Sequence, residues 1–472
     1  MERCARFYYL ESMNKRRMVM KVSSIILAAG LSKRMNSAVP KVLHPLVGQP
    51  ILAHCLDAVS RVTTEKPVVV VGYGADEVKA TFGDVIDYAL QEKQIGTADA
   101  VKSAHDMMRG RSDLVLVISA DMPLLQVETL QKLINTQSQN RGPLTMLTLQ
   151  APQSRGFGRI LRTPQGEVQA VIEERVANAE QLKINEYGTS VYCFSAPWLW
   201  ETIDQVQVSE TGEYFLTDLI EIAVQQGLHV ETQQVEEEEE AIGINNRLHL
   251  AEAEAVLRKR INQGWMLAGV TMLDPQRVYI EKKVSLGKDT MLYPEVYLRG
   301  TTSIGGGCRI GPNVVIEDCQ IGNRCTITHS VLEGAQLEDE VEMGPFGHLR
   351  PGTYLSKGVH MGNFGEIKNS RLAEGVKMGH FSYIGDATIG KDVNIGAGTI
   401  TCNFDGEKKN RTEVGDNAFI GSDTMLVAPL KVGEGAHTGA GSVVTEDVPP
   451  HTTVVGVPAK PLQKKKKAGG QR

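Results

Sequence analysis

The sequence predicts an α/β protein built of two different parts: a Rossmann-like domain with a mainly parallel, doubly wound sheet and, after a linker helix, a left-handed parallel β-helix. From residue 22 to about residue 243, short β-branched runs such as Pro67–Val71 alternate with helix-like stretches, which is typical of a doubly wound sheet. Beyond residue 274, one apolar residue recurs at about every sixth position, and glycine often follows it. This hexapeptide period is typical of a parallel β-helix.

The positions of these patterns set the expected boundaries of the parts. A segment that begins at residue 246 has apolar residues at helical spacing and predicts one helix between the two parts. We therefore expect an N-terminal extension (1–21), the α/β domain (22–245), the linker helix (246–273), the β-helix (274–461) and a basic tail (462–472).

The charge and cysteine content narrow the class of protein. Among 472 residues, 50 are Lys or Arg and 56 are Asp or Glu, and this balance gives no reason to expect a nucleic-acid partner. The seven cysteines have no C-x-x-C spacing, which fits a reducing compartment. No apolar run approaches the roughly 18 residues that a membrane span needs. We therefore expect a cytoplasmic protein with no nucleic-acid partner and no membrane span.

The hexapeptide period also bears on assembly. A prism of such coils buries aliphatic side chains along its axis and is too narrow to enclose a deep pocket of its own. Ligand sites on a prism would form most naturally between neighbouring chains. We therefore expect an oligomer, and specifically a homotrimer.

The loop after the first strand has the residues of a phosphate site. Ala28, Ala29 and Gly30 let a substrate approach the backbone, and Arg34 and Lys41 supply positive charge for a polyphosphate. The loop has neither the glycines and lysine of a P-loop nor the G-x-G-x-x-G of a dinucleotide site. Since ligands of such sheets bind beyond the carboxyl ends of the strands, we expect a nucleoside triphosphate here, close to Ser119–Pro123.

Several motifs extend this interpretation. The stretch L-A-A-G-x-x-x-R-M from residue 27, followed by P-K-V-L from residue 40, resembles the start of a sugar-phosphate nucleotidyltransferase. Further matches are Q-x-x-Q-I-G-T from residue 91, D-M-P-L from 121, F-G-R-I from 157, G-E-Y-F-L-T-D from 212 and G-I-N-N-R from 243. With the hexapeptide part, residues 22–461 resemble the bifunctional family that joins an N-acetylglucosamine-1-phosphate uridyltransferase to a glucosamine-1-phosphate N-acetyltransferase.

This resemblance implies the chemistry of the first domain. N-acetylglucosamine 1-phosphate would attack UTP with release of pyrophosphate, and Mg²⁺ held by Asp121 and Asn245 would offset the charge that gathers. The nucleotide and sugar site implied by the family comprises Leu27, Ala28, Ala29, Gly30, Arg34, Lys41, Gln91, Gly96, Thr97, Gly158, Glu173 and Gly188.

The second domain would transfer an acetyl group from acetyl-CoA to the amine of glucosamine 1-phosphate. The amine must be neutral to attack, so a base is needed, and histidine is the side chain that titrates near neutral pH. His380 is our candidate. The resemblance implies that glucosamine 1-phosphate contacts Arg350, Lys368, Tyr383, Asn394 and Lys409. It implies that acetyl-CoA contacts Ala397, Asn403, Phe404, Ser422 and Ala440. Such an enzyme would supply UDP-N-acetylglucosamine for peptidoglycan and lipopolysaccharide.

The first domain departs from the family pattern at several positions. Gly188 stands where the family usually has Asn, Ser119 where an aromatic residue is common, and Asp99 where His is usual. These departures leave two alternatives open. The first domain could use another sugar phosphate or nucleotide, or it could be a non-catalytic scaffold.

Overall fold

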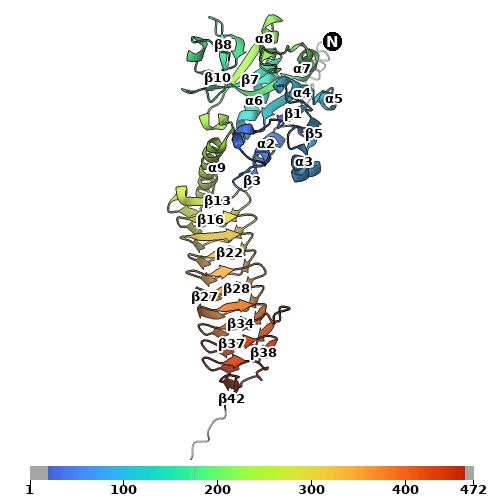
Figure 1. The fold of residues 1–472 in the computed structure, drawn as a ribbon. Coiled ribbons are helices and arrows are strands. Elements are labelled where there is room, and N and C mark those ends of the chain that lie inside the picture. Colours follow the sequence, from blue (N-terminus) through green and yellow to red (C-terminus); the bar gives the residue numbers. More distant parts are fainter. Residues whose placement is uncertain (1–19, 175, 463–472) are drawn as a thin grey trace, which may run out of the picture. The chain divides into compact units, whose positions relative to one another are not determined.

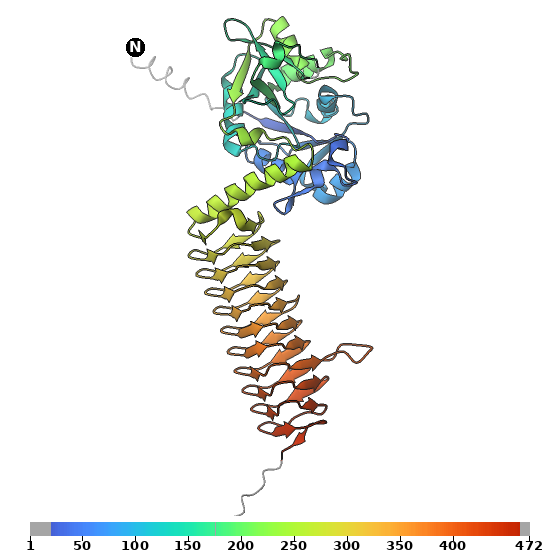
Figure 2. The same cartoon turned by 60° about the vertical axis from the view of Figure 1, so that its left-hand side comes forward.

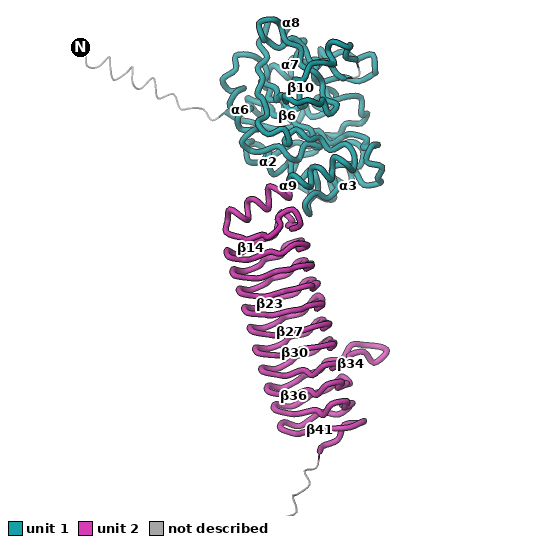
Figure 3. The backbone as a smooth tube through the Cα atoms, turned by 90° about the vertical axis from the view of Figure 1, so that its left-hand side faces the viewer, with its two compact units in different colours: residues 1–256 teal, residues 257–472 magenta. Residues whose placement is uncertain are grey.

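The computed structural model describes residues 20–174 and 176–462 and divides the chain into two compact units, residues 1–256 (unit 1) and 257–472 (unit 2) (Figure 3). Most of the expected N-terminal extension and of the basic tail lies outside the described residues. Among the helices that are described, none is long and apolar enough to cross a lipid bilayer.

Unit 1 is built on one mixed sheet, with nine strands in the described part of the chain (Figure 1). Across the sheet, the order is β11 (Val230–Gln234), β7 (Leu144–Gln150), β10 (Glu186–Ser195), β6 (Leu114–Ser119), β1 (Val22–Leu27), β4 (Val68–Val71) and β5 (Asp87–Leu90). Strands β6, β1, β4 and β5 run parallel to one another, as predicted, whereas β10 is antiparallel to both β6 and β7. Strand β10 follows the hairpin of β8 (Gly158–Arg162) and β9 (Val168–Ile172), and a strand reached through a hairpin can return without a crossover helix.

Helices cover both faces of this sheet, because successive strand residues point to opposite faces. Ile26 and Val69 belong to one buried cluster, and their neighbours Ile25 and Val68 belong to another. The first cluster includes residues of α2 (Ile51–Ser60), α3 (Ala75–Phe82) and α6 (Val127–Gln139). The second includes residues of α4 (Thr97–Lys102), α5 (His105–Met108), α7 (Ala196–Thr202) and α8 (Asp218–Gln225). The prediction of a doubly wound α/β fold is therefore confirmed.

Unit 2 is the predicted left-handed parallel β-helix (Figure 2). Its coils contribute strands in turn to three sheets of twelve, ten and nine strands over the described residues. These sheets run from β12 (Thr271–Met272) to β42 (Lys460–Pro461), from β13 (Val278–Ile280) to β40 (Val443–Val444) and from β14 (Ser285–Leu286) to β38 (Leu430–Val432). The residues of the six-residue period, such as Ile304, Ile310 and Ile316, are buried, and each buried aliphatic side chain contributes about 1.5–3 kcal/mol.

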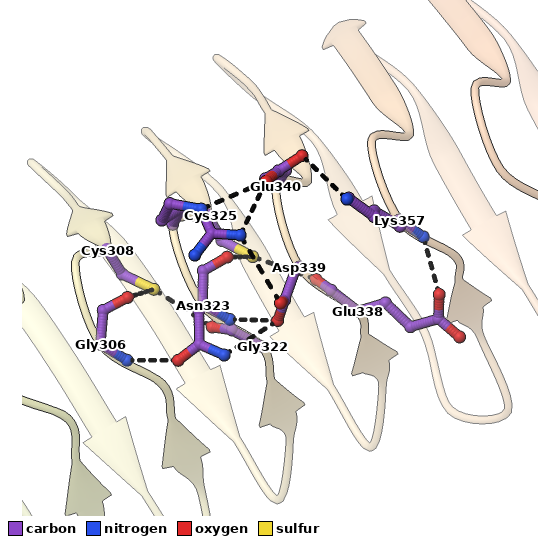
Figure 4. A network of polar contacts seen from close by, with 10 residues as sticks. Gly306, Cys308, Gly322, Asn323, Cys325, Glu338, Asp339, Glu340 and Lys357 are labelled. Carbon is purple, nitrogen blue, oxygen red and sulfur yellow. Dashed lines mark hydrogen bonds and ion pairs between the residues drawn. The ribbon is translucent and has the colours of Figure 1, made fainter.

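Polar contacts between the turns of successive coils add to this apolar core (Figure 4). The side-chain oxygen of Asn323 accepts from the backbone nitrogen of Gly306 at 2.9 Å, and Asp339 accepts from the backbone nitrogen of Asn323 at 2.7 Å. One coil further on, the Glu338 carboxylate accepts from the backbone nitrogen of Lys357 at 2.9 Å. Each turn therefore satisfies donors of its neighbour, which fixes the alignment of the coils.

The two ends of the prism differ from its middle. A helix, α9 (Arg247–Leu267), lies where the sequence predicted one, and within unit 2 its residues Ile261 and Trp265 pack against the prism core. At the other end, β41 (Thr453–Val455) pairs with β42 in the antiparallel direction, with Val455 opposite Lys460. Over the described residues, one of the three sheets therefore ends on a strand of reversed direction, whereas the sheets that end on β40 and β38 stay parallel.

Candidate active sites

A cavity of about 510 Å³ lies at the carboxyl ends of the parallel strands of unit 1. Strands β1 and β6 pair with Leu27 opposite Ser119, so the loops that follow both strands line the same cavity. Of the residues predicted for this domain, the wall includes Leu27, Ala28, Ala29, Gly30, Arg34, Lys41, Gln91, Gly96, Thr97, Asp121 and Glu173.

The loop after β1 brings two cations to this cavity. The backbone nitrogen of Ala28 donates to the Val70 carbonyl at 2.8 Å, which continues the sheet by one residue. Ser32 then adopts a left-handed conformation with φ of 54°, and its Oγ accepts from the backbone nitrogen of Lys41 at 3.2 Å. This contact ties the loop to the segment of Lys41, so Arg34 and Lys41 line one cavity.

Asp121 is the centre of a polar network. Lys41 Nζ donates to Asp121 Oδ2 at 2.7 Å, and Ser119 Oγ donates to Asp121 Oδ1 at 2.6 Å. The side-chain oxygen of Asn245 accepts from Arg34 at 2.9 Å and lies 3.5 Å from Lys41 Nζ. Both oxygen-bearing residues predicted to bind metal therefore contact the same lysine, although Asn245 is not part of the cavity wall.

The chemistry of these oxygens fits Mg²⁺. The Lys41 ammonium lies within reach of Asp121 Oδ2 and Asn245 Oδ1, so the two oxygens already accommodate a positive charge. Carboxylate and amide oxygens are ligands that Mg²⁺ accepts. Over the described residues there is no group of three or more His, Cys, Asp or Glu that could hold a metal ion. An ion here would complete its octahedron with waters and substrate phosphates, as Mg²⁺ commonly does.

The charge of Asp121 depends on Lys41. Burial raises the pKa of this carboxyl, but the charge and hydrogen bond of Lys41, joined by the hydroxyl of Ser119, outweigh burial and lower the pKa below its ordinary value. Asp121 is therefore an anion at neutral pH, the form that a metal ion requires.

The Gln91–Thr97 segment forms another part of the wall. Gly96 has φ of 126°, and a Cβ there would lie 2.2 Å from the Tyr214 carbonyl oxygen, so only glycine fits. Gln91 Nε2 donates to the Gly96 carbonyl at 3.0 Å and to Asp99 Oδ2 at 2.8 Å. Because both bonds use the nitrogen, the Gln91 side chain keeps its Oε1 as an acceptor.

Gly158 and Gly188 do not belong to the cavity wall. They pair with each other across β8 and β10. A Cβ at Gly188 would lie 2.8 Å from Met146 Cε, and a Cβ at Gly158 would lie 2.7 Å from Val171 Cγ1. The two predicted sugar-site glycines are thus packed under other side chains, whereas Glu173 lines the cavity itself.

A half-buried carboxyl, that of Asp218, makes stability depend on pH. Burial, together with the negative charges of Glu221 and Glu173, raises the pKa of Asp218 to about 6. A carboxyl with a raised pKa stabilises the fold at low pH, and this contribution is lost as pH rises through about 6. Asp218→Asn should therefore raise the melting temperature at pH 8 and leave it nearly unchanged at pH 4. Differential scanning fluorimetry at both pH values checks this, and an equal shift at both would contradict it.

In unit 2, strand register brings two predicted phosphate-binding cations together. Arg350 follows β25 (His348–Leu349), Lys368 ends β28 (Glu366–Lys368), and Leu349 pairs with Ile367. Arg350 and Lys368 therefore occupy equivalent positions on adjacent coils, about 4.8 Å apart along the prism. Glu366 accepts from Arg350 at 3.0 Å and holds that guanidinium in place.

His380 begins a column of predicted acetyl-CoA residues. It ends β30 (Lys377–His380), is exposed, and shares its position on the coil with Ala397, Ser422 and Ala440, as the pairing of successive strands shows. The backbone nitrogen of Gly441 donates to the Ser422 carbonyl at 2.8 Å, so these coils are in direct contact. The His380 imidazole therefore lies at one end of a row of small side chains, those of Ala397, Ser422 and Ala440, along the prism.

A buried amide supports Tyr383. Asn403 is 5% exposed, and its Nδ2 donates to Asp386 Oδ2 at 2.5 Å and lies 3.5 Å from the Tyr383 hydroxyl. Nearby, Lys409 Nζ lies 4.6 Å from the centre of the Phe404 ring, at the base of an exposed loop. These contacts do not test the prediction that Asn403 contacts acetyl-CoA; they place its amide beside the Tyr383 hydroxyl.

Sequence reasoning missed Asp386. This carboxylate is 7% exposed and accepts from Asn369 at 2.6 Å as well as from Asn403. A signal was present, because an aspartate after Gly385 at a prism corner takes a left-handed conformation, with φ of 53°, and such turn residues bond to nearby amides.

Asn394 begins β33 (Asn394–Ile395), where Lys377 pairs with it.

Two family models match this chain. The MobA-like NTP transferase domain matches residues 24–199, and the hexapeptide repeat of succinyl-transferase matches residues 411–446. Proteins named bifunctional protein GlmU match nearly the whole chain. The protein of Heliobacterium modesticaldum is 45% identical over 430 residues, which cover 91% of this chain and 94% of the relative. That of Geobacillus sp. is 43% identical over 432 residues (91% and 94%), and that of Geobacillus thermodenitrificans is 42% identical over 439 residues (93% and 96%).

These matches confirm the resemblance that the motifs indicated, in both its nucleotidyltransferase and its hexapeptide part. The alternative of a non-catalytic scaffold is thereby set aside. This chain belongs to the GlmU family of bifunctional enzymes, which combine a uridyltransferase with an acetyltransferase.

Proposed function

We propose that unit 2 acetylates glucosamine 1-phosphate with acetyl-CoA and that unit 1 then joins N-acetylglucosamine 1-phosphate to UTP, with release of pyrophosphate. The observation that supports this assignment most strongly is the convergence of Arg34, Lys41, Asp121 and Asn245 in one network at the strand ends. Two cations beside two oxygen ligands suit a triphosphate bound with a metal ion.

In the uridylyl step, this chain supplies charge rather than protons. Mg²⁺ between Asp121 and Asn245 would neutralise phosphate oxygens as the sugar phosphate attacks. Lys41 and Arg34 lie beside the same oxygens and would bind the leaving pyrophosphate. Ser119 keeps one oxygen of Asp121 hydrogen-bonded, which limits the rotation of the carboxylate.

The orientation of Gln91 supports a uracil base. Asp99 and the Gly96 carbonyl fix the amide so that Oε1 is the acceptor. Uracil presents an N3–H donor, which this oxygen can accept, whereas cytosine has an acceptor at that position. Asp99, a departure from the family pattern, therefore has a role in positioning Gln91.

In the acetyl step, His380 accepts the proton of the substrate amine. Arg350 and Lys368 on adjacent coils bind the sugar phosphate, and the strip of Ala397, Ser422 and Ala440 accommodates the extended arm of acetyl-CoA. Since no acyl-enzyme is needed, the amine attacks the thioester directly and CoA thiolate leaves.

The first test is pyrophosphate release by the purified protein with Mg²⁺. UTP and TTP are each offered with N-acetylglucosamine 1-phosphate and with glucose 1-phosphate, and acetyl transfer to glucosamine 1-phosphate is followed separately by thiol release from acetyl-CoA. We expect pyrophosphate only with UTP and the acetylated sugar. Release with another pair would assign unit 1 to a different sugar or nucleotide.

Assembly into a homotrimer is supported by an aromatic ladder beside the acetyltransferase residues. Phe346, Phe364 and Phe381 stack with ring centroids 5.1 Å apart and are 50–62% exposed. Phe381 follows His380 directly. A contiguous exposed apolar strip is typical of a surface covered by another protein, and a second copy of this chain would both cover the strip and close the acetyl site.

Phe364→Glu should therefore dissociate the assembly, because a carboxylate in the middle of the ladder would be buried without a partner. Acetyl transfer should fall at least about 100-fold if the site needs two chains, while pyrophosphate release should persist. Light scattering measures the mass, and Phe364→Leu, which keeps an apolar side chain, is the matched control. A trimer that survives Phe364→Glu would exclude this ladder from the interface.

A location in the cytoplasm stays a prediction, which is based on the few, widely spaced cysteines of the sequence. The described cysteines are all free thiols, which is compatible with it.

A further inference from the structure

One part of the unit 1 cavity is lined by hydroxyl groups. Ser119, Ser190, Tyr192 and Thr217 belong to its wall together with the carboxylate of Glu173. Thr217 Oγ1 donates to Glu173 Oε1 at 3.4 Å. Hydroxyls both donate and accept, and a carboxylate accepts, so this wall matches the alternating donors and acceptors of a sugar.

Tyr192 belongs to the cavity wall although it is almost fully buried. It lies on β10 opposite Val117 of β6, close to the strand end that leads to Asp121, and only 2% of its surface is exposed. The side chain of Ser190 is close enough to act on the pKa of this hydroxyl, and both residues belong to the cavity wall. Burial and the negative charge of Glu173 raise the pKa of Tyr192, so the phenol stays protonated and keeps a proton to donate.

Ser190 lies at an irregular point of strand β10, which places it in the cavity wall. Strand β10 is irregular between Gly188 and Tyr192, and Ser190 within this bulge has φ of 60°. Residues with a side chain seldom adopt this left-handed conformation, and such strain is concentrated at functional sites. The bulge exposes Ser190 between two buried neighbours, Thr189 and Val191.

Position 188 cannot supply a polar group to this wall. Gly188 is buried, and a Cβ there would meet Met146 Cε at 2.8 Å. A side-chain hydrogen bond from β10 to the sugar must therefore come from other positions of the strand, and Ser190 and Tyr192 are the β10 residues that belong to the cavity wall.

We propose that Tyr192 and Ser190 are sugar-binding residues of the uridyltransferase site, with the Tyr192 hydroxyl donating to an oxygen of the bound sugar 1-phosphate and the Ser190 hydroxyl binding the same sugar. This inference rests on the proposed function of unit 1. Together with Glu173, the two hydroxyls form a subsite that selects the sugar, separate from the nucleotide contacts of Arg34, Lys41 and Gln91.

The decisive variant is Tyr192→Phe, which removes one oxygen and keeps the ring. The KM for N-acetylglucosamine 1-phosphate should rise about 10-fold, as expected for the loss of a buried hydrogen bond, while the KM for UTP stays within about twofold. Steady-state pyrophosphate release measures both constants. A purely structural tyrosine would change both constants together or neither.

Ser190→Gly is the second variant, because glycine adopts the backbone conformation of residue 190 without strain. It should raise the sugar KM by about 3-fold without lowering the melting temperature. Calorimetry gives an independent readout: Tyr192→Phe should weaken binding of N-acetylglucosamine 1-phosphate to the UTP-saturated, Mg²⁺-free protein but not binding of UTP.

The possible results distinguish the sugar-binding proposal for Tyr192 and Ser190 from the proposed function of unit 1. If the wild-type protein turns over the sugar and both variants keep its KM, Tyr192 and Ser190 are not sugar-binding residues. If the wild-type protein releases no pyrophosphate with any sugar phosphate, the proposed function of unit 1 itself is wrong. A rise in the sugar KM that is confined to these variants supports the proposal.

Discussion

Replacing His380 by alanine should lower the rate of acetyl transfer to glucosamine 1-phosphate by about 10²–10⁴-fold, the usual contribution of a general base. The imidazole is exposed, and none of the described residues hydrogen-bonds its ring, so the substitution removes a reactive group without breaking a contact of the fold. Thiol release from acetyl-CoA measures the step, and uridylyl transfer by unit 1 should keep its wild-type rate.

The prism offers a matched control for this variant. His360 begins β27 (His360–Asn363), is exposed, and hydrogen-bonds with Glu342 at 3.1 Å. His360→Ala should leave acetyl transfer unchanged. Activity should return to the His380→Ala enzyme as pH rises, because the substrate amine then loses its proton without help. Wild-type activity in His380→Ala at neutral pH would exclude His380 as the base.

Lys41→Met should lower the kcat of pyrophosphate release by about 10²–10³-fold, because the variant loses a cation beside the departing phosphates. It should also unfold at a lower temperature without Mg²⁺. Lys41 lowers the pKa of the Asp121 carboxyl, and without this lysine the partly buried carboxylate loses its charge partner.

Mg²⁺ distinguishes these two effects of Lys41. Without the lysine, Asp121 Oδ2 is open to a metal ion, so Mg²⁺ should raise the melting temperature of Lys41→Met more than that of the wild type. Lys33→Met is the control, since Lys33 is exposed and does not belong to the cavity wall. An equal response to Mg²⁺ in all three proteins would mean that Lys41 does not compete with the metal.

Much of the fold could be predicted because it repeats local rules. The six-residue period predicted the β-helix, since every coil places its apolar residue in the same buried position, as for Ile310 and Ile327. The direction of β10 could not be predicted in this way. A strand that is buried on both faces has a continuous apolar run, which has no information about direction.

The site was predictable to the extent that its residues follow strand ends. Asp121 and the loop from Ala28 to Arg34 could be placed because parallel strands end at one edge. The burial of Gly188 could not be predicted, because it depends on packing against Met146, which belongs to another strand. Nor could the exposure of Ser190, which depends on a bulge that no motif marks.

The reversed strand at the end of unit 2 has a consequence for solubility. A parallel stack of coils presents a row of unpaired backbone groups at its last coil, and such an edge can template another chain and grow into a fibre. Here β42 covers β41 in the antiparallel direction and has Lys460 and Pro461 as its two residues. Proline has no backbone N–H to offer, and a lysine charge repels a like neighbour. This short strand therefore covers the open edge of one of the three sheets and makes pairing with the edge of another chain less favourable.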